Sequence, residues 1–329
     1  MRSFAKSHWL LLVIIAIVVI NALAWMTTIV QKEQNKEGFA WAAPDTSQIF
    51  FTEDGELIRY GRDLIANTSF YLGPKGKVAA ITNGMNCQNC HLDAGTRLWG
   101  NNYSGVFSSY PKFRERSGTV ENIYKRVNDC LERSLNGKPI DTNSREMQAI
   151  SSYINWLGRN VPKNKTPIAV GIRAIPLLNR PADPIKGKLI YVQTCQRCHG
   201  VEGRGLLNED STKYIYPPLW GENSYNTGAG LYRITRLAGY VKDNMPFDAP
   251  QNSRHLTNEE SWDIAAFVNS QPHPQKDYRK DWPNIPGKPI DYPFGPFADS
   301  FSALQHKYGP FEPIRQTQEN MKKKTDESH

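Results

Sequence analysis

The longest hydrophobic stretch of the chain lies close to its N-terminus. Residues 9–26 contain one polar residue, Asn21, and the positively charged Arg2 and Lys6 precede them. A stretch of 18 residues is long enough for a helix that crosses the hydrocarbon core of a bilayer. Positive charge ahead of such a helix predicts a cytoplasmic N-terminus and an exported remainder. The pattern therefore predicts a periplasmic protein that residues 9–30 anchor to the inner membrane.

A cleavable signal peptide is the alternative to a retained anchor. Residues 22–24 read Ala-Leu-Ala, which is an A-x-A cleavage site behind a suitable apolar stretch, so cleavage would follow Ala24. The apolar character continues through Ile29 and Val30, and this favours the retained anchor. Both alternatives export the chain.

The rest of the chain shows one helical pattern twice. Residues 54–69 and 183–194 carry apolar residues at helical spacing. Residues 142–158 and 257–271 each begin with Thr-Asn and have acidic residues in or near the first turn, which is typical of a helix N-terminus. Little strand-like alternation separates these helices. The chain is therefore predicted to be mostly α-helical, with two tandem domains of the same kind.

Composition shifts mark the predicted boundaries. Prolines disfavour a continuous helix between the two helical segments, and a Pro/Gly/aromatic-rich stretch without clear periodicity follows the second. We expect this final stretch to be an irregular tail packed over the domains. The predicted divisions are residues 1–32 (anchor and adjoining residues), 33–165 (first domain), 166–184 (linker), 185–275 (second domain) and 276–329 (tail).

Each helical segment carries one C-x-x-C-H motif directly after its first helix. Two thiols at this spacing can add to the vinyl groups of a haem, while the histidine binds the iron. A redox dithiol would not need the histidine, and a zinc site would need further ligands at suitable spacing. Two copies in an exported chain predict two covalently attached haems c. The attachment residues are Cys87 and Cys90, and Cys195 and Cys198, with His91 and His199 as proximal ligands.

The second haem has a methionine candidate for its other face. Met245 lies twelve residues before Thr257, in an Asn-Met-Pro-Phe-Asp context that indicates a loop. Thioether ligation raises the reduction potential of a haem. A buried, gap-filling methionine is the alternative.

The first segment has a cysteine at the corresponding position. Cys130 lies twelve residues before Thr142, and no methionine is available there, because Met85 adjoins the motif and Met147 lies inside the predicted helix. We therefore expect Cys130 to be the distal ligand of the first haem. A buried free thiol is the alternative, but an unpaired thiol is a liability in an oxidising compartment. A thiolate ligand lowers the potential, so electrons would fall from the first haem to the second.

The net charge of the chain limits the kinds of molecule that it is expected to bind. The chain of 329 residues is 39% hydrophobic and 22% charged, and it has a net charge of +8. No basic helix or aromatic-basic stripe is suited to nucleic acid, so nucleic-acid binding is not expected. A basic surface suits a small anion or an acidic protein, although a merely solvated basic surface is equally compatible.

Residues 86–140 resemble the TsdA-type thiosulfate dehydrogenases, which are dihaem cytochromes c that interconvert thiosulfate and tetrathionate. The run from Tyr110 to Lys138 is the most specific part, and residues 216–221, 292–299 and 307–314 extend the resemblance. It implies that His91 and Cys130 bind the first iron. It also implies a substrate pocket with Arg116 and Arg126, to which Ser134 and Lys138 belong as well. Guanidinium groups suit sulfur oxyanions because they present forked donors and permanent charge, although surface salt bridges are the alternative role.

The resemblance implies an enzyme that couples two thiosulfates into tetrathionate and passes two electrons to a soluble c-type cytochrome or another respiratory carrier. Cys130 would leave the iron or carry a transient sulfur adduct while Arg116 and Arg126 hold the anion. Some members have a lysine directly before the distal methionine, and the ligand can switch between the two. Here that position is Asn244 and the nearest lysine is Lys242, so we expect permanent Met245 ligation. A variant without that lysine would also run more readily as a tetrathionate reductase.

The main alternative is a dihaem electron-transfer cytochrome without a substrate site of its own. It predicts that Arg116→Ala and Arg126→Ala leave the function intact. A haem-based sensor fits less well because no signalling domain is attached. Peroxidase chemistry fits less well because both irons are expected to carry two axial ligands.

Overall fold

The computed structural model describes residues 39–249 and 256–327. The predicted anchor at residues 9–30 and the cleavage site after Ala24 lie outside the described residues. Within the described part of the chain, none of the helices combines the length and the apolar character that crossing a bilayer requires.

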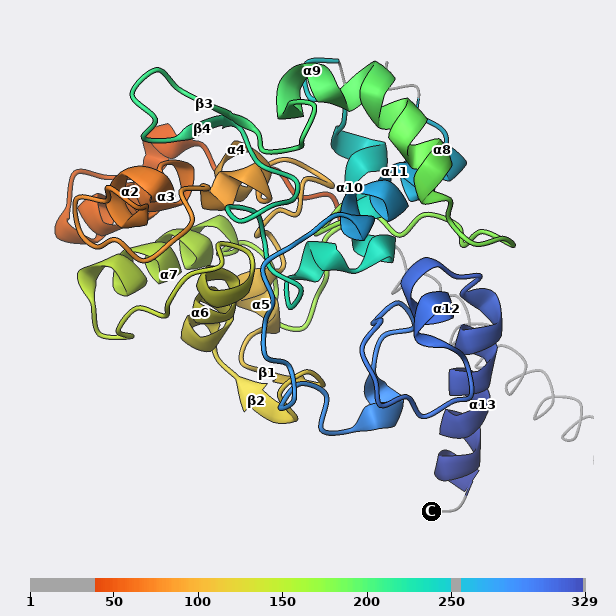
Figure 1. The fold of residues 1–329 in the computed structure, drawn as a ribbon. Coiled ribbons are helices and arrows are strands. Elements are labelled where there is room, and N and C mark those ends of the chain that lie inside the picture. Colours follow the sequence, from red (N-terminus) through yellow and green to blue (C-terminus); the bar gives the residue numbers. More distant parts are fainter. Residues whose placement is uncertain (1–38, 250–255, 328–329) are drawn as a thin grey trace, which may run out of the picture.

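Two pairs of crossing helices form the framework (Figure 1). In the first half, α2 (Glu53–Ala66) packs on α7 (Arg145–Leu157), and in the second half, α8 (Pro184–Ile190) packs on α11 (Asn258–Ser270). These are the four helices that the repeated pattern predicts. The protein is mostly helical, as expected.

A glycine allows close contact in both crossings. A Cβ atom at Gly61 of α2 would lie 1.9 Å from the carbonyl oxygen of Ala149 in α7. A Cβ atom at Gly187 of α8 would lie 1.8 Å from the carbonyl oxygen of Asp263 in α11. Only a residue without a side chain permits backbones to approach so closely. The two halves thus share a glycine at the helix crossing as well as the same pair of helices.

The helix caps agree with the sequence at one of the two expected threonines. Thr257 caps α11, because its side chain accepts from the backbone N–H of Glu260 while the Glu260 side chain accepts from the backbone N–H of Thr257. At α7 the cap is Ser144, which accepts from the Met147 N–H at 3.2 Å, so the expectation for Thr142 is wrong by two residues. The residues before Ser144 form a turn in which Asp141 accepts from the Asn143 N–H.

Shorter elements surround each framework. Those of the first half are α3 (Thr68–Leu72), α4 (Leu92–Gly95), α5 (Val106–Ser109), the antiparallel strands β1 (Lys112–Arg114) and β2 (Thr119–Glu121), and α6 (Ile123–Arg133). Those of the second half are α9 (Gln196–His199), the antiparallel strands β3 (Leu206–Leu207) and β4 (Tyr214–Tyr216), and α10 (Ile234–Asn244).

Each half has its own core, and a third cluster joins them. The first core lies between Trp41 and Val161, and the second includes residues from Ile175 to Ile314. In the joining cluster, Leu131 of α6 and Leu135, just after the helix, pack with Tyr214 and Tyr225 of the second half. The end of α6 is therefore held between the two halves.

The prediction of an irregular tail is wrong for residues 303–327. These residues form α12 (Ala303–Tyr308) and α13 (Glu312–Glu327). Phe311 and Ile314 are buried in the second core, whereas the later turns of α13 are mostly exposed. Because only the start of α13 buries apolar residues, its sequence lacks the repeated spacing by which a helix is recognised.

The tail also reaches the first half. After α11, the chain runs past β1 and β2 before it returns to α12 and α13 (Figure 1). The backbone N–H of Trp282 donates to the carbonyl oxygen of Arg116 at 2.7 Å. The segment from Lys276 to Phe294 thus lies over the loop that carries Arg116.

Candidate active site

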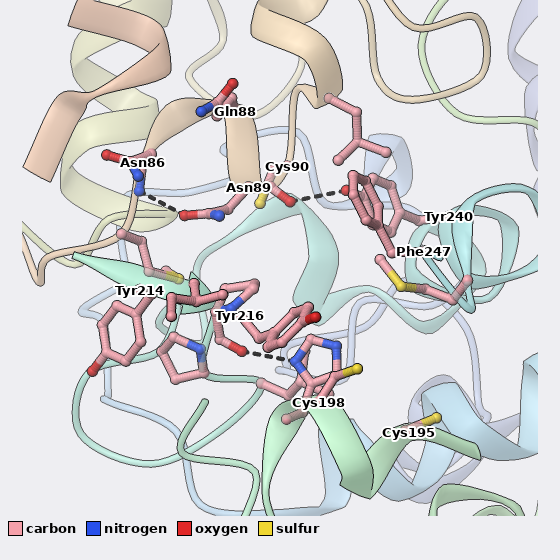
Figure 2. Close-up of a pocket in the computed structure, with 18 of the residues that line it drawn as sticks. Asn86, Gln88, Asn89, Cys90, Cys195, Cys198, Tyr214, Tyr216, Tyr240 and Phe247 are labelled. Carbon is pink, nitrogen blue, oxygen red and sulfur yellow. Dashed lines mark hydrogen bonds between the residues drawn. The ribbon is translucent and has the colours of Figure 1, made fainter. Parts of the chain in front are cut away.

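A cavity of about 480 Å³ lies between the two halves. This volume is in the range of about 300–1,000 Å³ that cofactor pockets occupy. Figure 2 shows Asn89 and Cys90 of the first motif on one side of the pocket and Cys195 and Cys198 of the second motif on the opposite side. The hydroxyl of Tyr240 donates across the boundary between the halves to the Asn89 carbonyl oxygen at 2.9 Å.

The second-motif histidine is held in the orientation that a haem ligand needs. Nδ1 of His199 lies 2.8 Å from the carbonyl oxygen of Pro217, so Nδ1 carries the proton and donates. The lone pair is therefore on Nε2. Burial lowers the pKa of His199, which keeps the imidazole neutral.

The first-motif histidine repeats this arrangement. Nδ1 of His91 donates to the carbonyl oxygen of Asn101 at 2.6 Å, and the ring stacks on Tyr103 with centroids 4.4 Å apart. Burial lowers the pKa of His91 to about 4. Both motifs thus present a neutral imidazole with its lone pair on Nε2.

Met245 lies on the wall of the cavity that also contains His199. It directly follows α10 and packs against the second core. Its two nearest rivals as ligands have other partners. Asn244 is fully buried and its Nδ2 donates to the carbonyl oxygens of Trp99 and Tyr240, while Nζ of Lys242 donates to the carbonyl oxygen of Leu256.

The donor set fits haem c at both motifs. All five cysteines are unpaired thiols, so each motif offers two thiols and one oriented, neutral histidine. Within the described ranges, 39–249 and 256–327, no three His, Cys, Asp or Glu side chains converge as ligands of a single metal ion. The cavity walls near the second motif are largely apolar, including Leu219, Leu237, Val241, Ile264 and Val268.

The fifth cysteine lies close to the first motif. Cys130 is partly buried in the last turn of α6. Burial, with a contribution from the nearby Cys130, raises the pKa of Cys87 to about 11 and that of Cys90 to about 12. The same cysteine raises the pKa of Tyr103, the residue that stacks on His91. Cys130 therefore shares the surroundings of the first C-x-x-C-H motif.

The candidate residues on α6 lie along one face. Arg126 and Cys130 are one helical turn apart, and Ser134, the C-cap residue, follows one turn later. Cys130 is the largest influence on the pKa of Arg126 and raises it. The structure thus brings Arg126 and Cys130 together. Lys138 lies beyond the end of the helix, and its side chain is exposed.

Arg116 approaches Arg126 from the loop between β1 and β2. Burial, together with the like charges of Arg133 and Arg126, lowers the pKa of Arg116 to about 10, although Asp281 opposes the shift. The guanidinium carbon lies 5.7 Å from the centroid of the Trp282 ring. A buried guanidinium among like charges is a site that an anion would stabilise.

Sequence reasoning missed a third arginine of this group. Arg236 of α10 is supplied by the second half, and burial lowers its pKa, with Arg126 among the like charges that contribute. Nothing in the local sequence separates Arg236 from its neighbour Arg233, which pairs with Asp291 at 2.7 Å. Only the packing of the two halves identifies it.

Pairing divides the arginines of this region into two sets. Arg133 forms two hydrogen bonds with Asp281 at 2.6 and 2.7 Å, and Arg114 lies 3.9 Å from Glu121. Among the described residues, by contrast, no carboxylate lies within ion-pair distance of Arg116, Arg126 or Arg236. In the described residues, Arg116, Arg126 and Arg236 therefore carry positive charge that no carboxylate within ion-pair distance neutralises, and Arg126 lies one helical turn from Cys130.

The Arg133–Asp281 pair ties the tail to α6, and its side chains are only 11% and 9% exposed. We expect Asp281→Asn to lower the free energy of unfolding by about 3–5 kcal/mol, because it leaves a buried guanidinium uncompensated. Urea denaturation of the holoprotein measures this change. Asp277→Asn removes an exposed pair with Arg279 and should have little effect. Equal stability of the two variants would contradict a structural role for the buried pair.

Comparison with known proteins gives the family. Residues 77–162 match the family described as SoxA/TsdA, cytochrome c domain, and residues 185–272 match the cytochrome c family. The predicted pair of cytochrome c domains is thereby confirmed. Two such domains carry two covalently bound haems c, as the motifs predict.

Individual relatives agree with these matches. Thiosulfate dehydrogenase from Psychrobacter arcticus is 36% identical over 73% of this chain and 71% of its own length. That from Allochromatium vinosum is 34% identical over 67% of this chain and 79% of its own. The solved structure of thiosulfate dehydrogenase (TsdBA) from Marichromatium purpuratum is 29% identical with a TM-score of 0.68, covering 79% of this chain and 54% of that one. The protein belongs to the TsdA-type thiosulfate dehydrogenase family of dihaem cytochromes c.

Proposed function

We propose that this protein couples two thiosulfate dianions into one tetrathionate at the site formed by Cys130 and the unpaired arginines, with release of two electrons. One observation carries the proposal of this site. Three buried or half-buried guanidiniums, none with a carboxylate within ion-pair distance in the described residues, influence one another, and one of them, Arg126, lies one helical turn from the thiol of Cys130 beside the first haem motif. A pure electron carrier has no use for such a set.

Four cysteines and four further side chains would hold the cofactors. Cys87 and Cys90 attach the first haem and Cys195 and Cys198 the second. His91 and Cys130 would bind the first iron, and His199 and Met245 would bind the second. When bound, the two haems supply one-electron acceptors for the two electrons that each turnover releases. The side-chain nitrogens of Asn244 and Lys242 donate hydrogen bonds to backbone carbonyl oxygens, and this supports Met245 as a permanent ligand.

The arginines oppose the repulsion between the two substrates. Bringing two dianions into contact requires positive charge at the site, and forked guanidinium donors match the sulfonate oxygens. Arg126, one turn before Cys130, would hold a sulfonate so that the terminal sulfur faces the thiol. Arg116, from the loop between β1 and β2, and Arg236, from α10, would add positive charge, and Ser134 and Lys138 complete the set that the family resemblance implies.

Forming the sulfur–sulfur bond of tetrathionate removes one electron from each thiosulfate, and no atom is lost. The reverse reaction returns two electrons to tetrathionate and separates two thiosulfates. A soluble c-type cytochrome or another respiratory carrier would exchange the electrons with the second haem.

A periplasmic location fits the cofactors, because haem c is attached outside the cytoplasm. Residues 9–30 would export the chain, either as a retained inner-membrane anchor or as a signal cleaved after Ala24. We propose the anchored form, since the apolar character continues beyond Ala24.

A steady-state assay in both directions tests the function. We expect holoprotein with two haems, counted from its reduced absorption spectrum, to transfer electrons from thiosulfate to an oxidised cytochrome c and from a reduced donor to tetrathionate. Fully loaded protein that turns over neither sulfur compound would contradict the proposal. It would favour the electron-transfer cytochrome without a substrate site.

A further inference from the structure

Three buried polar atoms without partners lie together where the tail crosses the first half. Across residues 39–249 and 256–327, six buried side-chain nitrogen or oxygen atoms lack a hydrogen-bond partner. Half of them are Nε of Arg116, Nε1 of Trp282 and the hydroxyl of Tyr292. Trp282 is 8% exposed and Tyr292 is 4% exposed. Leaving such a group unsatisfied costs about 1–3 kcal/mol, so three in one place need an explanation.

The three side chains are neighbours. The Arg116 guanidinium lies 5.7 Å from the Trp282 ring centroid, and the Trp282 and Tyr292 rings are 5.7 Å apart. Arg116 and Arg133 both influence the pKa of Tyr292, which burial raises. The group thus joins a loop of the first half to two positions of the tail.

The hydrogen-bonding capacity of these three side chains shows which kind of partner is missing. The Arg116 and Trp282 nitrogens can only donate, and the tyrosine hydroxyl can donate as well. Asp281, a carboxylate that influences the pKa of both Arg116 and Tyr292, is already occupied, because both of its oxygens accept from Arg133. An acceptor must therefore come from outside the chain, and the positive surroundings favour an anion.

We propose that Arg116, Trp282 and Tyr292 form a second sulfonate subsite, which binds the end of tetrathionate, or the second thiosulfate, that lies away from Cys130. This inference rests on the proposed function. Tetrathionate carries a sulfonate at each end, and Arg126 beside Cys130 accounts for only one of them. The charge of Arg126 lowers the pKa of Arg116, so the two guanidiniums share one electrostatic environment.

The assignment gives the tail a role in substrate binding. Trp282 and Tyr292 lie on the segment that crosses the loop between β1 and β2, where Pro283 packs against Gly118. The backbone hydrogen bond from Trp282 to Arg116 sets the spacing of the two side chains. A chain without this segment would retain Cys130 and Arg126 but lose two of the three donors.

Two variants, Trp282→Phe and Tyr292→Phe, remove one donor each and keep an aromatic ring in place. A hydrogen bond to a charged group contributes about 1.5–3 kcal/mol, so each variant should raise the KM for tetrathionate by about 10-fold or more. The kcat should change by less than about 3-fold, because these donors bind the sulfonate equally in the ground state and in the transition state. Tyr278→Phe, in the same aromatic cluster, is the matched control and should keep the KM of the wild type.

Calorimetric binding of tetrathionate to oxidised holoprotein, without an electron donor, separates this inference from the proposed function. We expect the same increase in Kd for both variants, with haem content and thermal stability unchanged. Wild-type KM and Kd in both variants would overturn the subsite and assign the three atoms to ordered water. A wild-type protein that binds tetrathionate through these residues but does not turn it over would contradict the proposed function and leave the subsite supported.

Discussion

Replacing Cys130 with methionine is expected to leave both haems attached and to lower kcat with thiosulfate by at least about 1,000-fold. Both C-x-x-C-H motifs remain intact in this variant, so attachment does not depend on Cys130. Losing a group that acts directly on the reacting atoms costs several orders of magnitude in rate. Methionine would also raise the potential of the first haem, since a thioether donates less electron density than a thiolate.

The variant is compared with wild type by steady-state turnover and by redox titration of each haem. Glu132→Gln is the matched control on α6, because Glu132 is directed toward Lys276 at 3.6 Å. The control should retain the wild-type rate and potentials. A Cys130→Met protein with unchanged turnover would remove Cys130 from the chemistry.

The second large effect is expected at Arg126. Replacing it with alanine should lower kcat/KM for thiosulfate by about 100-fold or more, because the site loses a forked, charge-assisted pair of donors next to Cys130. Arg126→Lys keeps the charge but not the fork, so its loss should be intermediate, about 10-fold. Comparing kcat/KM among wild type, Arg126→Ala and Arg126→Lys separates the contribution of the positive charge from that of the forked guanidinium geometry.

An exposed arginine serves as the control for Arg126. Arg279 is 88% exposed and pairs with Asp277, so Arg279→Ala should behave as wild type. Equal activity of Arg126→Ala and wild type would favour the alternative of an electron-transfer module without a substrate site. A fall in the alanine variant with full activity in the lysine variant would assign Arg126 a purely electrostatic role.

Local patterns predicted the features that depend on neighbouring residues. The C-x-x-C-H motifs indicated two haems, and the family matches at residues 77–162 and 185–272 confirm the two cytochrome c domains. Helical spacing located α2, α7, α8 and α11. α2 and α7 bury one face, α11 buries nine consecutive residues, and α8 buries only Gly187, where it crosses α11. Thr257 was recognisable because a capping box is complete within four residues.

Features that depend on distant contacts were not predicted. The sequence pattern did not predict α13, because this helix buries only its first turn, around Ile314, and so has no repeated apolar spacing. Arg236 and Arg233 are similar in sequence context, and only Asp291, 58 positions after Arg233, distinguishes the paired arginine from the unpaired one. Trp282 and Tyr292 resembled ordinary packing residues until their unpartnered atoms were seen beside Arg116.

The proposed site for Cys130 follows partly from the repeat and partly from the fold. Counting back from the final helix of each half aligns Cys130 with Met245. In the structure Cys130 lies inside the last turn of α6, whereas Met245 directly follows the end of α10. Cys130 and Met245 therefore correspond only approximately, since both lie at a helix end but at different backbone positions.

The central claim is that the sulfur of Cys130 binds the first iron. Low-temperature electron paramagnetic resonance of the oxidised holoprotein tests it most directly, with wild type and Cys130→Met measured side by side. The account predicts one low-spin signal typical of histidine–thiolate ligation, which the substitution replaces while the signal of the other haem stays the same. Identical spectra for the two proteins would contradict it.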